Sequence, residues 1–216
     1  KVMGLAPYGE PRFAQTILDQ LVDLKEDGSF RLNQDYFDYC TGLRMTNQRF
    51  DRLFGGPARA PDELLDQRHM DLAASIQAVT EEVVLRLTRS LARESSSRNL
   101  CLAGGVALNC VANGKILRDG QFDRLWVQPA AGDAGGALGA ALSAYHGYRG
   151  QPRLGNGDRD AMQGSYLGPE FSQDDIEARL RAVGARFEIP DDEELIARSA
   201  KALEEGKALG WFQGRM

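Results

Sequence analysis

The sequence predicts an α/β protein, and three observations support this fold class. Helical and strand-like segments alternate along the 216 residues, which is the pattern of α/β folds. Two apolar segments, at residues 100–103 and 125–131, lead into glycine pairs at Gly104-Gly105 and Gly135-Gly136. Each pair precedes a helical pattern, and the pairs lie 31 residues apart, a length that suits one strand–helix unit with its connection.

Composition excludes several classes of partner. The chain is 43% hydrophobic and 26% charged, typical of a soluble globular protein. Its net charge is −5 and its lysines and arginines do not cluster, which argues against nucleic acid as the main partner. No apolar run approaches the roughly 18 residues of a membrane span. We therefore expect neither a nucleic-acid nor a membrane partner.

The three cysteines are odd in number and lack C-x-x-C spacing. Cys101 falls in a predicted buried strand and Cys110 on the helix after it, so both are predicted to be core thiols. This usage favours a reducing, cytoplasmic location.

Apolar spacing predicts the elements of the first half. We expect a helix from about residue 13 to 24, a turn at 26–28, a strand near 30–32 and a short helix at 48–54. The longest helix is predicted from about His69 to Glu94 because one apolar stripe recurs at spacings of four and three. That stripe comprises Leu72, Ile76, Val79, Val83, Leu87 and Leu91, whereas Glu81, Glu82, Arg86, Arg89 and Arg93 lie mostly off it.

The rest of the chain predicts a domain boundary. A helix is expected from Ala134 to about Tyr148, and the composition then shifts to Gly, Pro, Arg and Asp. We place a first domain at 1–148, a linker at 149–165 and a second domain at 166–216. The second domain is expected to have helices at about 172–183 and 191–205, with Ser172 and Asp191 as N-caps, and strands at 186–189 and 208–212. The strands near Leu100 and Leu125 should be central in a mixed sheet with helices packed against it.

The two glycine pairs predict a ligand cleft. Glycines at a strand-to-helix junction let the backbone approach a ligand, and a helix start offers unpaired N–H groups to an anion. Two such junctions side by side suggest a nucleotide or phosphate site, with Asp133 as its acidic group. Neither pair alone is specific, since neither lies in a G-x-x-x-x-G-K-[ST] loop or a clean G-x-G-x-x-G motif.

Two polar residues near the cleft have alternative interpretations. Asp133 could bind a cation, hydrogen-bond a ribose or orient a nucleophile, or it could cap the following helix. Asn109 could reach a ligand held by the first glycine pair, or it could make a hydrogen bond between helices. His69 and His146 have no H-x-x-x-H spacing and are expected at helix ends. Arg215 could meet a phosphate.

Five ordered segments resemble the O-carbamoyltransferases, which include nodulation-factor and antibiotic-tailoring enzymes. These segments are KVMGLAPYG at 1–9, CLAGGVALNCVAN at 101–113, QPAAGDAGGALGAA at 128–141, YLGPEFS at 166–172 and GWFQGRM at 210–216. The resemblance implies the second half of an actin/sugar-kinase/heat-shock-ATPase-like domain, followed by the truncated start of a second α/β domain that processes carbamoyl phosphate.

The resemblance also implies an activity and its cofactors. Members of this family use carbamoyl phosphate and ATP to form carbamoyl-adenylate, and then carbamoylate a hydroxyl of a small-molecule acceptor. The residues implied as nucleotide-binding are Gly104, Gly105, Val106, Asn109, Gly135 and Gly136. Asp133 is implied as a catalytic residue and as one ligand of a divalent metal, typically iron, together with two histidines of an H-x-x-x-H helix.

This sequence lacks that histidine pair and the arginine-rich continuation of the family after Met216. We therefore expect half an active site and an inactive fragment. The absence of the first half of the fold should also leave apolar surface exposed, which makes a homo-oligomer an open prediction. Two other functions stay open: a non-catalytic nucleotide-binding module, and, ranked last, a sugar kinase of the same superfamily.

Overall fold

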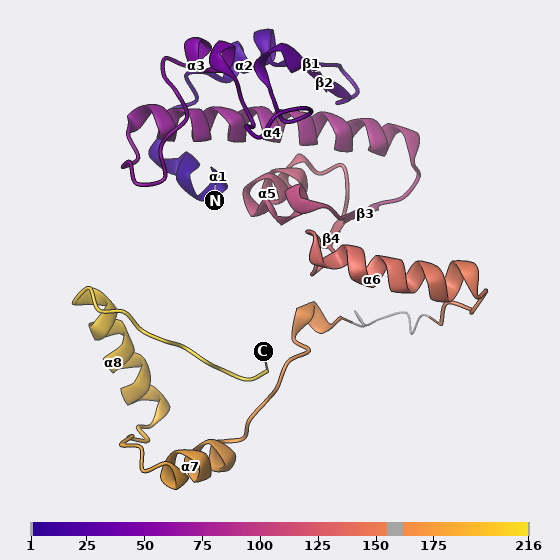
Figure 1. Cartoon of the computed structure of the whole chain (residues 1–216). Helices are drawn as coiled ribbons and strands as arrows, with labels where there is room; N and C mark the ends of the chain where they lie inside the picture. The colour runs from indigo at the N-terminus through magenta and orange to yellow at the C-terminus, as the bar shows by residue number, and fades with distance from the viewer. Residues whose placement is uncertain (1, 155–161, 216) are drawn as a thin grey trace. The chain divides into compact units, whose positions relative to one another are not determined.

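A computed structural model of the chain describes residues 2–154 and 162–215. It divides into two units, Lys1–Tyr145 and His146–Met216. Its described residues form helices and two small two-stranded sheets, one antiparallel and one parallel (Figure 1). The α/β character is confirmed, whereas the single mixed sheet expected from the sequence is not found among these residues.

The first unit is arranged around the helix α4 (Gln67–Glu94). Figure 1 shows two layers on opposite sides of this helix. One layer contains α2 (Ala14–Gln20), the strands β1 (Val22–Leu24) and β2 (Phe30–Leu32), and α3 (Gln48–Leu53). The other contains α1 (Val2–Leu5), β3 (Asn99–Leu102), α5 (Cys110–Asp119) and β4 (Arg124–Val127).

Helix α4 confirms the longest predicted element and begins two residues earlier than expected. Asp66 caps it, because the Asp66 carboxylate accepts the backbone N–H of His69 at 3.0 Å. The backbone N–H of Asp66 in turn donates to Nδ1 of His69 at 3.2 Å, which completes a capping box. His69 thus lies at a helix start, as predicted.

The predicted helix from residue 13 to 24 is wrong in its second half. Helix α2 ends at Gln20, and Val22–Leu24 instead pairs antiparallel with Phe30–Leu32. The turn between the strands explains the difference, since Gly28 adopts φ +87° and its N–H donates to the Lys25 carbonyl, a conformation that glycine favours. Val22 is buried against Ile17 and Phe54 in this layer.

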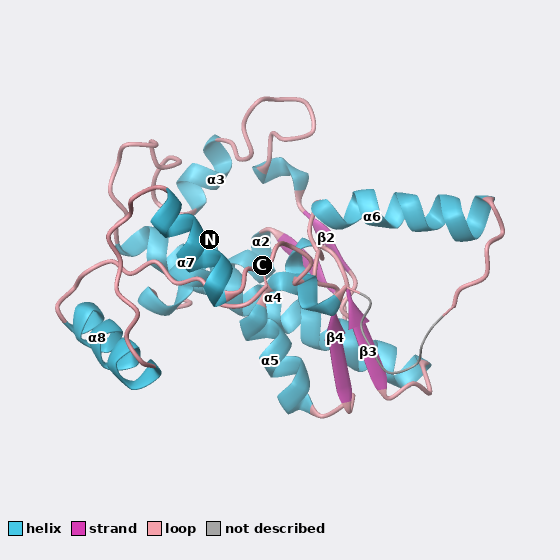
Figure 2. Ribbon diagram, turned by 90° about the horizontal axis from the view of Figure 1, so that it is seen from below, coloured by secondary structure: helices cyan, strands magenta, loops and turns pink. Residues whose placement is uncertain are grey.

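The second layer contains the two strands predicted near Leu100 and Leu125, and the structure shows that they pair in parallel. Strand β3 pairs with β4, and Leu100 packs with Ile116 and Phe122 against α4 and its neighbours. Figure 2 shows both strands side by side next to α5. Only one face of this pair is covered, so Leu100 is buried whereas Cys101 is exposed. The expectation that Cys101 and Cys110 are core thiols is therefore wrong.

The end of the first unit and the second unit follow the helical predictions but not the strand predictions. Helix α6 (Ala134–Leu142) continues as a π-helical segment, Ser143–Tyr148. Helices α7 (Gln173–Ala182) and α8 (Asp192–Glu204) begin at the N-caps Ser172 and Asp191, as expected. Segments 186–189 and 208–212 are not strands, because neither has a pairing partner among the described residues.

The remaining segments are short turns of 3-10 helix, at Ala6–Tyr8, Gln34–Tyr36, Gly105–Leu108 and Gln163–Ser165. The predicted linker at 149–165 includes 155–161, which lie outside the described residues, so the domain limits stay a prediction. No helix in the described ranges is long and apolar enough to cross a membrane.

Candidate functional site

The two glycine turns meet at one edge of the parallel sheet. Strands β3 and β4 are in register from Asn99 and Arg124 to Leu102 and Val127, so both turns follow the carboxyl ends of adjacent strands. The backbone N–H of Gly104 donates to the Ala131 carbonyl at 2.8 Å. This bond joins the first turn to the second, and in open α/β sheets such an edge is where ligands bind.

The first turn places an open glycine face before helix α5. Gly104 has φ +104° and ψ 162°, a conformation in which an L side chain is strained. Gly105–Leu108 then forms one 3-10 turn. A Cβ atom added at Gly104 or Gly105 would meet nothing within 4 Å, and Val106 is 57% exposed. The backbone of this turn is thus accessible from one side.

The second turn is tighter at Gly135 than at Gly136. The N–H groups of Gly135 and Gly136 donate to the carbonyls of Gly132 and Asp133, both at 3.1 Å. A Cβ atom at Gly135 would overlap the Ala130 carbonyl oxygen, whereas one at Gly136 would meet nothing within 4 Å. Packing therefore requires glycine at 135, and Gly136 leaves open space beside the turn.

Asp133 does not cap the helix that follows it. It occupies the N-cap position of α6 but has helical dihedrals, φ −58° and ψ −33°, and its side chain makes no capping hydrogen bond. The residue is exposed. The capping interpretation is wrong, which leaves the carboxylate oriented to solvent at the edge of the two turns.

The described residues do not complete a metal site around Asp133. Across residues 2–154 and 162–215, no group of three or more His, Cys, Asp or Glu side chains is arranged to hold a metal ion. An exposed carboxylate fits one ligand position, so the remaining ligands of the implied iron would have to come from residues outside these ranges.

Asn109 makes the hydrogen bond between helices that its second interpretation predicts. Its Oδ1 accepts the backbone N–H of Ala112 at 3.1 Å and thereby caps α5. Its Nδ2 donates to Oε1 of Gln77 on α4 at 2.9 Å, and Nε2 of Gln77 donates back to Oδ1 at 3.2 Å. The role of Asn109 in nucleotide binding stays a prediction.

The sequence interpretation missed the polar residues behind this amide pair. Gln77 and Glu81 are 9% and 8% exposed, although Glu81 was expected to lie mostly off the apolar stripe of the helix. Nε2 of Gln77 donates to Glu81 at 2.9 Å, and Lys115 of α5 forms an ion pair with the same carboxylate. The signal in the sequence is the i, i+4 spacing of Gln77 and Glu81, which places both side chains on one face of a helix. The structure shows that this face meets the first glycine turn.

A second ion pair fixes the far end of α5. The Arg89 guanidinium on α4 donates from Nε to Oδ2 of Asp119 at 3.0 Å and from Nη2 to Oδ1 at 2.5 Å. These hydrogen bonds hold the pKa of Asp119 below its usual value and are of the bidentate type. Helix α5 is thus attached to α4 at both ends.

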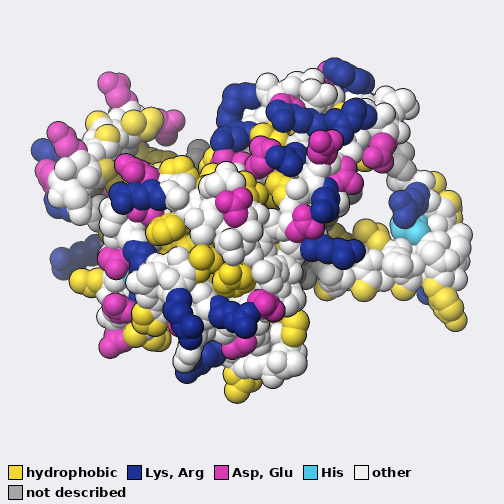
Figure 3. All heavy atoms as spheres, turned by 90° about the horizontal axis from the view of Figure 1, so that it is seen from above, with side chains coloured by type: hydrophobic (Ala, Val, Ile, Leu, Met, Phe, Trp, Pro, Cys, Tyr) yellow, Lys and Arg dark blue, Asp and Glu magenta, His cyan; other side chains and the backbone are white. Residues whose placement is uncertain are grey.

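Apolar surface is exposed in two grooves along α4. A groove of about 390 Å³ beside the first turn is lined by Ile76, Val83 and Val106, among others. An adjoining groove of about 710 Å³ shares Ile76 with the first and includes Leu5 and Phe37. On the face drawn in Figure 3, apolar side chains reach the surface between interspersed cationic and anionic ones. Self-association through this surface stays a prediction.

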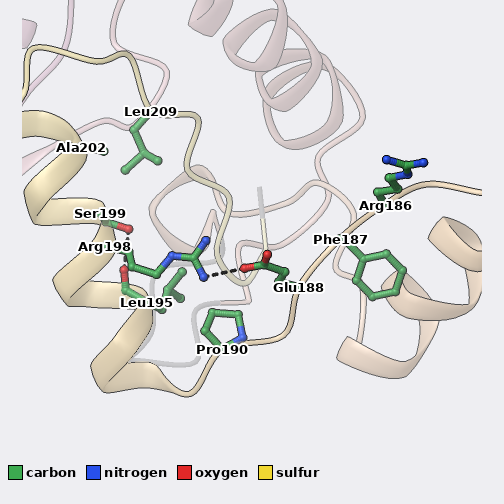
Figure 4. A pocket seen from close by; sticks show the side chains of 9 residues that line it. All are labelled: Arg186, Phe187, Glu188, Pro190, Leu195, Arg198, Ser199, Ala202 and Leu209. Carbon is green, nitrogen blue, oxygen red and sulfur yellow. Dashed lines mark hydrogen bonds and ion pairs between the residues drawn. The ribbon is translucent and has the colours of Figure 1, made fainter.

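The second unit has a cavity of about 670 Å³ with two arginines (Figure 4). Arg198 pairs with Glu188 at 2.6 Å, while the side chain of Arg186 points away from this ion pair. Arg215 donates to the Gly168 carbonyl at 2.8 Å and pairs with Glu170 at 2.9 Å. Its predicted contact with a phosphate remains a prediction, and the structure places its guanidinium on protein acceptors.

Comparison with known proteins gives a family match over the first two thirds of the chain. Residues 1–142 match the model of the carbamoyltransferase N-terminus. Over the whole chain, the sequence is 58% identical to the uncharacterized protein sll1178 of Synechocystis sp. and 38% identical to the nodulation protein NolNO of Sinorhizobium fredii. It is also 34% identical, over 54% of its length, to the 3'-hydroxymethylcephem-O-carbamoyltransferase of Streptomyces clavuligerus.

The chain corresponds to only part of these relatives. It spans 35% of the Synechocystis protein, 29% of NolNO and, through its matched part, 20% of the Streptomyces enzyme. The family match contains both glycine turns, Asp133, Asn109 and the whole of α4.

Proposed function

The chain belongs to the carbamoyltransferase family, and we propose that its two glycine turns form the nucleotide-binding part of a site for O-carbamoyl transfer. The observation that carries this proposal is the junction of the turns, joined by the hydrogen bond from Gly104 to Ala131. Both turns lie at the carboxyl edge of adjacent parallel strands, where nucleotides bind in open α/β sheets. The Streptomyces relative named above is an O-carbamoyltransferase.

The proposed fold of the complete domain is actin-like, and residues 1–148 are its second half. The parallel pair β3–β4, with α4 and α5 packed beside it, supports this arrangement. In this proposal the remaining strands of the sheet come from sequence outside the described chain. They would cover the apolar surface beside α4.

The proposed reaction uses ATP and carbamoyl phosphate and proceeds through carbamoyl-adenylate. Water first removes the phosphate of carbamoyl phosphate and leaves carbamate. A carbamate oxygen then attacks the α-phosphorus of ATP, which releases pyrophosphate and forms carbamoyl-adenylate, and attack by an acceptor hydroxyl on the carbamoyl carbon finally releases AMP. The backbone at Gly105 in the first turn would hold the adenylate phosphate, because this position is open to a ligand, and Gly136 would leave room for the phosphate beside the second turn. Fixing the adenylate in this way would orient its carbonyl toward the acceptor.

Asp133 is proposed to work at the acceptor side of the site. Its carboxylate is exposed and makes no cap, so it is free to serve as one metal ligand, with histidines supplied from outside the described residues. A bound divalent metal would act as a Lewis acid toward the carbamoyl carbonyl or the acceptor hydroxyl. We also propose a reducing, cytoplasmic location, because Cys40, Cys101 and Cys110 are all free thiols.

The test compares wild-type and Asp133→Asn full-length protein. Pyrophosphate release from ATP, dependent on carbamoyl phosphate, is measured beside carbamoyl transfer to a hydroxyl acceptor and bound metal. We expect Asp133→Asn to lose metal and to lose transfer by a factor of about 100 or more, within the range for removal of a group that stabilises the transition state, while the fold is kept.

Two outcomes would contradict the proposal. Unchanged metal content and transfer would show that Asp133 is neither ligand nor catalytic residue. A wild-type protein that binds ATP but releases no pyrophosphate with carbamoyl phosphate would favour the non-catalytic nucleotide-binding module instead.

A further inference from the structure

Gln77 and Glu81 form a buried polar pair for which the proposed chemistry has no direct use. Both project from α4 toward α5, and both are less than a tenth exposed. Buried polar groups remain in a fold when they are hydrogen-bonded, and a buried carboxylate needs a partner. Here the partners are Asn109 and Lys115, which belong to the first glycine turn and to the helix it opens.

The backbone N–H of Ala112 determines which atom donates and which accepts in every hydrogen bond of this group. The backbone N–H of Ala112 is a donor, so the atom of Asn109 that it meets must be the oxygen Oδ1. The amide Nδ2 of Asn109 then faces Oε1 of Gln77, and Nε2 of Gln77 faces both Oδ1 of Asn109 and Glu81. Glu81 accepts this bond and also pairs with Lys115. Reversing either amide would oppose two donors or two acceptors.

This group connects the glycine turn to the longest helix of the chain. The turn is also held by the bond from Gly104 to Ala131 and by the bond from Nδ2 of Asn113 to the Ala107 carbonyl, 2.7 Å. Those two bonds stay within the sheet edge and α5. The amide pair of Gln77 and Asn109 connects the end of the turn to α4, whose capping box and buried residues, among them Ala73 and Val79, fix its own position.

We propose that Gln77 is a positioning residue that sets the first glycine turn, residues 104–109, for nucleotide binding. Glu81 and Lys115 orient the Gln77 amide so that it presents one donor and one acceptor to Asn109. Gln77 lies behind the turn, on the α4 side, and acts on the ligand through Asn109. This inference rests on the proposed nucleotide site, and its test includes a measurement that does not need nucleotide.

The test uses Gln77→Glu and Gln77→Leu in the full-length protein. The leucine removes both hydrogen bonds to Asn109, and the glutamate keeps the size but removes the donor at neutral pH. The charged groups that face position 77 are Glu81 of α4 and Lys115 of α5. Glu81 disfavours the ionised form of a carboxyl group at position 77, whereas Lys115 favours it, and protonation of this group in acid would restore an O–H donor at position 77.

The control is Thr80→Val, one turn along the same helix. The hydroxyl of Thr80 donates to the Ile76 carbonyl of its own helix at 2.7 Å, so valine leaves the bonds between α4 and α5 in place. Circular dichroism of each variant confirms that it folds.

Two measurements decide the inference. Hydrogen exchange of the backbone amides at 104–113, without nucleotide, should rise in Gln77→Leu and, at about pH 8, in Gln77→Glu, and should match wild type in Thr80→Val. ATP affinity by isothermal titration should weaken about tenfold in both Gln77 variants, the effect of one lost amide pair. When the pH is lowered from about 8 to about 5.5, the exchange rates and the ATP affinity of Gln77→Glu should move toward those of wild type at the same pH, and those of Gln77→Leu should not.

The outcomes separate the two proposals. Equal exchange at 104–113 in wild type and all three variants would overturn the positioning role, whatever ATP does. Faster exchange without any ATP binding by wild type would sustain the link from Gln77 to the turn and refute the nucleotide site. Faster exchange with unchanged ATP affinity would overturn the inference, because the turn's position would then not matter to the ligand.

Discussion

Adjacent glycines in the second turn should respond in opposite ways to one added methyl group. Both Gly135 and Gly136 lie in the first turn of α6. In a helix, replacement of glycine by alanine normally stabilises by about 0.5–1 kcal/mol. A methyl group on Gly136 meets nothing within 4 Å, whereas one on Gly135 overlaps the Ala130 carbonyl oxygen and lies 3.3 Å from its carbonyl carbon.

The overlap of the added methyl group with the Ala130 carbonyl sets the difference in stability between Gly135→Ala and Gly136→Ala. The neighbour is backbone, which cannot rotate away as the end of a flexible side chain can, so the turn or α6 must move. Overpacking of this kind costs about 1–3 kcal/mol. Because the helix preference is common to both substitutions, Gly135→Ala and Gly136→Ala should differ by the overlap alone, about 1–3 kcal/mol.

Local hydrogen exchange measures this difference directly. The amides of residues 134–142 are followed in the full-length protein without nucleotide, and exchange rates are converted to free energies of local opening. We expect faster exchange in Gly135→Ala than in wild type and equal or slower exchange in Gly136→Ala. Equal protection in the two variants would refute the close approach of Gly135 to Ala130 and, with it, this geometry of the second turn.

Two further predictions concern the framework of the first unit. The hydrogen bond from the Glu10 backbone N–H, assisted by the Gln67 side chain, holds the pKa of Asp71 below its usual value. The ionised Asp71 therefore stabilises the fold above its unfolded pKa, and this contribution is lost as the pH falls through its folded pKa. The unfolding temperature of Asp71→Asn should consequently depend less on pH below about 4 than that of wild type. Parallel plots of unfolding temperature against pH for the two proteins would contradict this. Ile116 is 1% exposed, so Ile116→Ala should destabilise by about 2–5 kcal/mol in denaturant unfolding, against less than about 0.5 kcal/mol for the half-exposed Leu117→Ala; similar losses would show that the cluster around Ile116 does not stabilise α5.

The sequence predicted the elements whose determinants are local. The N-caps Ser172 and Asp191 and the long helix α4 depend on residues within one or two turns, and the structure confirms all three. The apolar stripe that predicted α4 is not its buried face, because Val79 is buried whereas Leu87 and Leu91 are exposed. The strands near Leu100 and Leu125 and the turns after them were also predicted, because an apolar run that ends in glycines is a local pattern.

The errors arose where the outcome depends on distant partners. A strand exists only when another pairs with it, so segments 186–189 and 208–212 look like strands in sequence and remain unpaired among the described residues. Cys101 was expected to be buried because both faces of a central strand are covered, yet β3 and β4 are covered on one face. The same reasoning applies at position 81, where an apparently surface glutamate is buried because Lys115 of α5 neutralises it.

The sequence predicted where the candidate site lies but not which side-chain contacts surround it. The sequence indicated two turns at one sheet edge, and the hydrogen bond from Gly104 to Ala131 joins them. It did not indicate that Asn109 faces α4 and pairs with Gln77, since that contact joins residues 32 apart in sequence. Nor did the sequence decide between the two interpretations of Asp133. The helical dihedral angles of Asp133 and the lack of a capping hydrogen bond from its side chain exclude the capping role.

A nucleotide footprint on the full-length protein tests most directly whether the two turns form one site. Hydrogen exchange is measured with and without saturating ATP, and peptides that cover residues 104–109 and 133–136 are compared with the rest of the chain. We predict that ATP protects both peptides together, with the same midpoint concentration, because Gly104 and Ala131 join the two turns. Protection of one turn without the other, or of neither while ATP binds elsewhere, would contradict a shared nucleotide site at this edge of the sheet.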